Sequence, residues 1–441
     1  MSAVAAGPPV GVRADASPSR PGVVAALGLL LALVAALVVG GAAPALGQDA
    51  QQGVRGTLNN AGEPLAGVTI RVEQDGDEVD EVETDASGAW FIEVPEPGEY
   101  TVILDTDTLP EGLGVRSEGG AEREVTVRPG GISPALFVLG EGGDTGSTKF
   151  DQFLQLFVGG LQFGLVIAMA AIGLSLIFGT TGLTNFAHGE LVTGGAILAY
   201  VFNVGFGLNL IPAALLAVGV GALLGGLLDR GLWRPMRKKG TGLIAALVVS
   251  IGLALVLRYL YLYFFGGSSR SYGQYATQAP ISIGPISIPP RDLVIMAISV
   301  VVLILVGLAL QRTRLGKATR AVADNPSLAA SSGIDVERVI NVVWIGGSGL
   351  AVLGGVFLAL SQQVSWLLGF QILLLLFAGV TLGGLGTAFG ALVGSVVIGI
   401  FTQVSTLVIP AELQNVGALV ILILILVVRP QGILGRAERV G

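Results

Sequence analysis

The sequence contains no cysteine and one histidine, His188. These two counts exclude disulfides, zinc sites built on Cys ligands and histidine-built metal sites within one chain. Charge is also scarce, because Asp, Glu, Lys and Arg make up 12% of the residues, about half their share in soluble domains. Hydrophobic residues reach 52%, and the mean hydropathy is +0.78. This composition predicts a polytopic membrane protein.

The few charges are unevenly distributed along the 441 residues. Residues 50–144 hold 20 acidic and 5 basic residues, whereas the rest of the chain holds 11 acidic and 19 basic residues. The chain therefore combines a small acidic domain with a basic membrane part.

Residues 1–47 have the features of an export segment. Arg13 and Arg20 precede an apolar stretch of 17 residues, Val23–Val39, and small residues follow up to Gly47. This order is typical of a signal peptide with cleavage near Gly47–Gln48. An uncleaved N-terminal anchor is the alternative, since a spanning helix needs about 20 apolar residues. Both alternatives place the following residues outside the cytoplasm.

Residues 50–140 predict an extracytoplasmic β-sandwich. Val68, Ile70 and Val72 alternate with polar residues, as in a half-buried strand. Short runs of the same kind recur, separated by Gly- and Asn-containing turns. They lie at Ala89–Val94, Tyr100–Leu104 and Val125–Arg128.

The order "GEPLAGVTIRVE…TDASGAWFIEVPEPGEYTVIL" resembles the carboxypeptidase regulatory-like domain, a prealbumin-like β-sandwich that is generally non-catalytic. The acidic cluster Asp75–Asp85 lacks the ligand spacing of an EF-hand, so a solvated face is favoured over a calcium site. Residues 141–150 are rich in Gly and Ser and predict a linker.

Residues 151–441 carry nine apolar runs, several of them short, and predict eight or nine transmembrane helices. Three Lys/Arg-rich stretches, around Arg234, around Arg314 and after Val428, are placed in the cytoplasm by the positive-inside rule. Tyr259, Tyr261 and Tyr263 predict an aromatic belt at the outer interface, where Arg258 can snorkel. The apolar runs are Phe153–Phe178, Leu191–Val204, Leu210–Leu228, Leu243–Phe265, Leu293–Leu310, Val339–Leu360, Leu367–Leu382, Ala388–Val408 and Val416–Val428.

Two further patterns concern the helices and their connections. Gly386, Gly390 and Gly394 recur every fourth residue, which favours close helix packing. In the basic loop 311–339, Asn325 is suited to cap a helix that begins at Pro326, and Gly333 to end it. A docking helix is favoured over an ordinary basic loop.

The stretch "TNFAHGE" places Asn185, Phe186, His188, Gly189 and Glu190 between two apolar runs. Three interpretations compete: an interfacial helix end, a proton relay, or a break between helices near a permeation route. In the third, Glu190 caps a helix or pairs with His188, and Gly182 and Gly189 supply the turns.

Five segments then occur in one order: "AIGLSLIFGTTGLTNFAHGELVTGGAIL", "DRGLWRPMR", "RTRLGKATRAVADNPSLAASSGIDVERV", "LGGLGTAFGALVGSVVIGI" and "RPQGILGR". Together they resemble the membrane permease subunit of branched-chain amino-acid ABC importers. The resemblance runs from Phe153 to the C-terminus, and the exported β-sandwich departs from it.

The resemblance implies a multi-pass protein of a bacterial cell membrane, with its N-terminal domain outside and its C-terminus in the cytoplasm. It implies as partners two cytoplasmic ATP-binding subunits, a second homologous permease subunit or a second copy, and an extracytoplasmic binding protein that delivers a small amino-acid substrate. It favours the third interpretation of "TNFAHGE", a break between helices near the translocation pathway. Its ATPase-coupling loop corresponds to Arg314, Gly316, Arg320, Asn325, Pro326, Gly333 and Ile334.

No Gly-x4-Gly-Lys-Ser/Thr segment occurs in the sequence, so ATP hydrolysis is expected from partners and no enzymatic activity from this chain. No cofactor, metal or nucleic-acid partner is predicted. Two alternatives stay open: an importer permease for urea or amides, and a stand-alone secondary transporter, although few ionisable residues are available to the latter.

Overall fold

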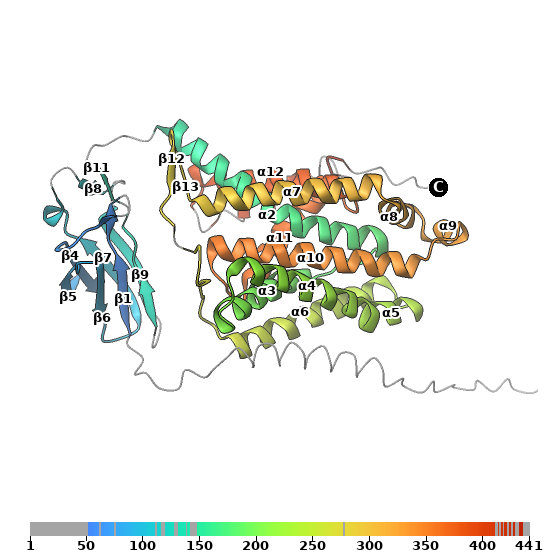
Figure 1. The fold of residues 1–441 in the computed structure, drawn as a ribbon, viewed down its shortest axis with the longest axis horizontal. Helices are drawn as coiled ribbons and strands as arrows, with labels where there is room; N and C mark the ends of the chain where they lie inside the picture. The colour runs from blue at the N-terminus through green and yellow to red at the C-terminus, as the bar shows by residue number, and fades with distance from the viewer. Residues whose placement is uncertain are drawn as a thin grey trace, which may run out of the picture.

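The computed structural model describes residues 52–410, except 61–62, 75, 111–112, 116–119, 128–130, 138, 142–147 and 277, together with scattered residues between 413 and 434. The predicted export segment 1–47 and most of the predicted linker lie outside the described residues. Figure 1 shows a strand-rich domain at one end of a helical bundle.

The N-terminal domain is built around two sheets. One has the order β5-β4-β7-β9 and the other the order β10-β1-β6. The strands are β1 (Gly53–Thr57), β2 (Asn59–Asn60), β3 (Glu63–Pro64), β4 (Thr69–Gln74), β5 (Asp77–Glu83), β6 (Ala89–Glu93), β7 (Gly98–Leu104), β8 (Leu113–Val115), β9 (Glu122–Val127), β10 (Ile132–Pro134) and β11 (Leu139–Glu141).

The apolar residues that alternate along β4 are buried, as predicted. Ile70 and Val72 are fully buried, as is Val68 just before the strand, and they pack with Trp90 and Tyr100 in the domain core. Asp77–Glu83 of the acidic cluster form the edge strand β5, most of whose residues are exposed. Acidic side chains on an edge discourage pairing with another chain. Within the described residues, no group of His, Asp and Glu could hold a metal ion.

Asp85 gives this domain a pH-dependent contribution to stability. Its Oδ1 accepts hydrogen bonds from the Ser87 hydroxyl at 2.7 Å, the Ser87 amide at 2.8 Å and the Ala89 amide at 2.9 Å. These bonds, that from the Ser87 hydroxyl above all, hold the pKa of the Asp85 carboxyl below its usual value.

Because the pKa is lowered on folding, the carboxylate stabilises the domain at neutral pH, and this contribution is lost as the pH falls through the folded pKa. We expect Asp85→Asn to lower the urea midpoint of residues 50–144 at pH 7, and the difference from wild type to shrink below about pH 4. A difference that stayed constant with pH would contradict this assignment.

The second part is all-helical apart from one hairpin. The helices are α2 (Lys149–Thr181), α3 (His188–Tyr200), α4 (Leu210–Leu228), α5 (Arg234–Lys238), α6 (Leu243–Phe265), α7 (Pro290–Arg312), α8 (Arg314–Asp324), α9 (Pro326–Ser331), α10 (Val336–Gln362), α11 (Leu368–Gly383) and α12 (Ala388–Val404), with π-helical segments η2 (Val201–Gly205) and η3 (Asp229–Trp233), 3-10 turns η1 (Thr106–Thr108, in the β domain) and η4 (Ser405–Leu407), and a hairpin of β12 (Ile281–Ile283) and β13 (Ile286–Ile288).

Among the described residues, 6 helices are long and apolar enough to cross a membrane. The shorter predicted runs form α3, which continues into η2, and α11. About half of the last run, Val416–Val428, lies outside the described residues. The prediction of a polytopic helical membrane protein is therefore confirmed.

α2 lies at the centre of the bundle. It packs against α7, α10, α11 and α12, and its residues from Gly164 to Ser175 are all buried. α8 and α9 lie at the end of the bundle opposite the β domain, and the β12–β13 hairpin lies at the near end (Figure 1). α10 begins beside α9. Just beyond the other end of α10, Val364 forms an isolated β-bridge with Arg270 in the loop after α6.

Candidate functional site at the break between α2 and α3

The stretch "TNFAHGE" is a break between two helices. Gly182 ends α2 in the left-handed conformation, with a φ of 69°, which glycine adopts without a side-chain clash. Asn185 then turns the chain, because its side-chain oxygen accepts a hydrogen bond from the Ala187 amide at 3.1 Å. The turn leads directly into α3 at His188.

His188 and Gly189 fix the first turn of α3 against two neighbouring helices. The His188 side chain is fully buried, and its Nε2 lies 2.9 Å from the carbonyl oxygen of Ala170 in α2. Gly189 faces Gly369 of α11, so closely that a Cβ would come within 2.7 Å of the Gly369 carbonyl oxygen. Gly189 was predicted to supply a turn, and this was wrong: it lies within the helix and permits a close contact.

Glu190 pairs with Arg258 of α6. Its Oε1 accepts hydrogen bonds from the Nη2 and Nε atoms of Arg258, at 2.8 Å and 3.1 Å. The Glu190 side chain is 0% exposed and that of Arg258 12%. The predicted cap or pairing with His188 was therefore wrong, since Glu190 is neither the cap residue of α3 nor bonded to His188. Arg258 points toward Glu190 instead of snorkelling.

Aromatic side chains close the pair off. The guanidinium of Arg258 lies 3.8 Å from the centre of the Phe370 ring of α11, a cation–π distance. The hydroxyl of Tyr261 donates to the backbone oxygen of Glu190 at 3.0 Å and is buried. Tyr261 was predicted to belong to an interfacial belt, and its burial corrects that, whereas Tyr259 and Tyr263 are exposed.

Phe186 completes the contacts of the break. Its amide donates to the Ser250 hydroxyl of α6 at 3.2 Å, and its ring centre lies 5.0 Å from that of Phe377 in α11. The segment therefore contacts α2, α6 and α11 within a few residues. A distortion here would alter the packing of all three helices.

Three polar atoms of the break are buried and have no hydrogen-bond partner among the described residues: Asn185 Nδ2, His188 Nδ1 and Glu190 Oε2. Buried polar groups are usually paired, so such a group calls for an explanation. Because His188 and Glu190 lie inside the protein, the structure argues against an interfacial helix end. The atoms offer hydrogen bonds, and none belongs to a nucleophile–base set.

Two of the three predicted packing glycines lie where helices approach closely. Gly390 and Gly394 of α12 face Gly383 and Gly379 of α11, where a Cβ would overlap backbone atoms. Gly386 lies before α12, where its φ of 79° shows that it supplies a turn, and it packs closely against Gly179 of α2. Its prediction as part of a helical stripe was wrong because α12 begins only at Ala388.

The predicted coupling loop forms two short helices, α8 and α9. Asn325 Oδ1 accepts from the Leu328 amide at 3.0 Å and caps α9, whose first residue is Pro326. Gly333 follows α9 with a φ of 82°, and the Ile334 amide donates to the Ala329 carbonyl at 3.1 Å. Arg314 begins α8, and Arg320 donates to the Gln311 carbonyl at 3.4 Å.

Gly316 of the predicted coupling loop lies at a close contact between two helices. It lies inside α8 and is buried. A Cβ there would overlap the carbonyl oxygens of Leu310 and Ala309 at the end of α7. The glycine therefore allows α8 to fold back against α7.

One polar network was not predicted. Arg237 lies 2.8 Å from Asp229 Oδ1 and 2.9 Å from Glu337 Oε2, and Asn341 donates to Asp229 Oδ2 at 3.1 Å. It ties η3 and α5 to the start of α10, beside the stacked rings of Trp233 and Trp344. The stretch "DRGLWRPMR" was interpreted as a basic cytoplasmic stretch and as one of the segments of the family resemblance, and no buried polar contact was predicted for it. The one feature of the sequence that indicates this network is Asp229, an acidic residue directly after the long apolar run Leu210–Leu228.

A family model defines the class of this protein. Residues 156–428 match the family described as branched-chain amino acid transport system / permease component. The chain belongs to this family, which confirms the resemblance found in the sequence.

Two relatives named as branched-chain amino acid permeases match over nearly their whole length. The chain is 29% identical over 307 residues to the high-affinity branched-chain amino acid transport system permease protein LivH of Escherichia coli, covering 66% of this chain and 98% of the relative. It is 28% identical to the corresponding permease protein BraD of Pseudomonas aeruginosa, covering 65% and 97%. The ribose import permease protein RbsC of Escherichia coli is 28% identical, covering 60% and 83%. No solved structure matches the chain.

Proposed function

We propose that this chain is the membrane permease subunit of an ATP-driven importer, and that it translocates branched-chain amino acids delivered by an extracytoplasmic binding protein. The observation that carries the proposal is the family match over residues 156–428. Relatives of which the chain covers 98% and 97% are named as branched-chain amino acid permeases. The helix break with its buried polar residues lies inside the matched region.

A sugar is the second candidate substrate, because the ribose permease aligns with 60% of the chain. Uptake by the complex reconstituted in vesicles, with its ATPase and binding-protein partners, separates the two. We expect ATP-dependent uptake of labelled leucine that unlabelled isoleucine and valine reduce and ribose does not. If ribose reduced uptake and isoleucine and valine did not, the proposed function would be sugar transport instead.

The proposed partners are two cytoplasmic ATP-binding subunits and a second permease subunit, homologous or identical. The proposed topology places the β domain outside and α8 and α9 in the cytoplasm. Two observations support it: the basic residues gathered on α5 and α8, and the position of α8 and α9 opposite the β domain (Figure 1). Accessibility of single cysteines introduced into this cysteine-free chain would test it.

α9 and its flanks are proposed to insert into the ATPase. Nothing lies within 4 Å of a Cβ built at Gly333, so only its positive φ restricts substitution. Asn tolerates this conformation, whereas β-branched Val does not. We therefore expect Gly333→Val to reduce substrate-stimulated ATP hydrolysis several-fold and Gly333→Asn to retain it. Equal activity of the two variants would show that the turn after α9 is not required for coupling.

The break between α2 and α3 is proposed to border the translocation pathway and to hold its geometry. His188 and Asn185 serve this role through their bonds to Ala170 and Ala187. Asn185→Leu removes the side-chain oxygen that accepts the bond in the turn, and we expect uptake to be lost in assembled complexes. Normal uptake by this variant would contradict the role.

The β domain is proposed to fold by itself and to tether partners or envelope material outside the cell. Its own buried core supports an independent fold. Residues 50–144 expressed alone should be soluble and should unfold cooperatively. Deletion that abolished transport despite normal membrane assembly would assign the domain to the transport path instead.

A further inference from the structure

Two hollows on the surface of the bundle meet at the end of α7. The first is a cavity of about 910 Å³ between α2, α8 and the turn before α12, and Lys317 and Arg320 line it. The second is an apolar groove of about 320 Å³ along α7, between α2 and α12. Gln311 and Phe389 line both hollows, so the two form one continuous surface.

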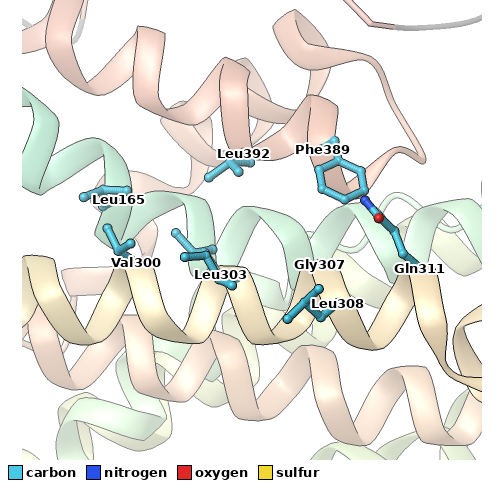
Figure 2. Close-up of a pocket in the computed structure, with 9 residues that line it drawn as sticks. Leu165, Val300, Leu303, Gly307, Leu308, Gln311, Phe389 and Leu392 are labelled. Carbon is cyan, nitrogen blue, oxygen red and sulfur yellow. The ribbon is translucent and has the colours of Figure 1, made fainter.

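The groove, which we call the α7 groove, is bordered by Leu165, Val300, Leu303, Leu308, Phe389 and Leu392. Figure 2 shows Gln311 and Phe389 together at one end of it and Leu165 with Val300 toward the other. Val300, Leu308 and Phe389 are exposed, whereas Leu303 is buried at the base. The groove is therefore open on its outer side.

Its length fits one leaflet of a bilayer. From Val300 to Gln311, α7 rises by about 16 Å, which is close to half of a hydrocarbon core of about 30 Å. An acyl chain of one leaflet would therefore run along the groove from the headgroup region to the bilayer midplane. α7 is among the helices apolar enough to span a membrane, so these residues lie at lipid depth.

The cavity at the end of the groove carries net positive charge. Lys317 and Arg320 come from α8, and Asp324 is the one acidic residue among the described residues that line the cavity. Lys and Arg side chains are the usual partners of phosphate oxygens, which they contact by charge-assisted hydrogen bonds. The Gln311 side chain adds a polar group at the junction.

We propose that these hollows bind one anionic phospholipid of the cytoplasmic leaflet, with its phosphate beside Lys317 and Arg320 and one acyl chain in the α7 groove. The cytoplasmic leaflet carries a negative surface potential, to which Lys and Arg near the surface are attracted. The assignment to the cytoplasmic leaflet rests on the topology proposed above, but the binding of an anionic lipid does not. A lipid held here would fill the space between α7, α2 and α12 next to the proposed coupling helices.

Native mass spectrometry of the purified full-length chain tests the proposal. After incubation with equal amounts of phosphatidylglycerol and phosphatidylcholine, we expect one phosphatidylglycerol to be retained per chain in clear preference. Soluble glycerol phosphate should not displace it. Equal retention of the two lipids, or displacement by glycerol phosphate, would overturn the proposal without use of any variant.

Variants then locate the site. Each Lys or Arg near an anionic surface contributes about fivefold to affinity, so Lys317→Gln with Arg320→Gln should weaken retention about 25-fold. The control pair Lys238→Gln with Lys239→Gln removes the same charge from exposed residues outside the hollows.

A third variant tests the α7 groove. Ile304→Trp, at a groove residue that is 56% exposed, should also block retention. Equal loss in the control pair would show a general surface attraction only. Normal retention by Ile304→Trp, or disulfide-linked dimers of Ile304→Cys, would assign the groove to another occupant, in the second case a second copy of the chain.

Discussion

Replacement of Arg258 by Met should lower the free energy of unfolding by about 3–5 kcal/mol, the usual cost of leaving a buried charge without its partner. Glu190 is 0% exposed, and its described ion pair is with Arg258. The variant should therefore melt at a much lower temperature in detergent, or fail to accumulate in the membrane. Size-exclusion chromatography after heating to a series of temperatures measures the melting temperature of each variant.

Two control variants distinguish the effect of breaking the Glu190–Arg258 ion pair from the effect of removing an arginine side chain. Arg338→Met removes an exposed arginine and should be nearly neutral. Glu190→Met combined with Arg258→Met removes both charges and should recover much of the stability lost by the single variant, since apolar replacement of a buried pair is often neutral. A double variant less stable than Arg258→Met would show that the pair is not the relevant unit.

Replacement of Gly394 by Leu should be as damaging, because the new side chain would meet backbone atoms. A Cβ at Gly394 would lie 2.6 Å from the Gly383 amide nitrogen and would overlap the Gly379 carbonyl oxygen. Backbone cannot rotate away as a side chain does, so α11 and α12 would have to separate. We expect a loss of at least about 3 kcal/mol, the upper end of the range for overpacked cores.

Gly219→Leu is the control for this change. Gly219 also lies in an apolar helix, α4, and nothing lies within 4 Å of a Cβ built there. It should therefore retain wild-type melting. If Gly394→Leu also melted like the wild type, the close approach of α11 and α12 would not hold in the membrane.

Local patterns in the sequence predicted much of the fold. The alternation at Val68, Ile70 and Val72 fixed the inner face of β4, and Asn325 with Pro326 fixed the start of α9. Each of these features depends on residues a few positions apart. Strand β5 was missed because its two apolar residues, Val79 and Val82, lie three positions apart at a sheet edge and do not alternate as in an ordinary half-buried strand.

The interior of the candidate site could not be predicted in the same way. Glu190 and Arg258 are 68 residues apart, and no local signal pairs them. Arg258 stands next to three tyrosines, which suggested an interface. Only the packing of α6 against α3 shows that Arg258 turns inward. Gly386 was misassigned because a spacing of four does not show where a helix begins.

The length of α10 has a consequence for communication across the membrane. This helix has 27 residues, so it extends over about 40 Å. It begins just after α9, is tied to α5 by Glu337 and Arg237, and ends next to the backbone pair of Val364 with Arg270. A partner that tilted the start of α10 would displace its far end in the opposite direction. Spin labels at single cysteines introduced at the two ends would report on binding of the proposed ATPase at the end of α10 that it is not proposed to contact.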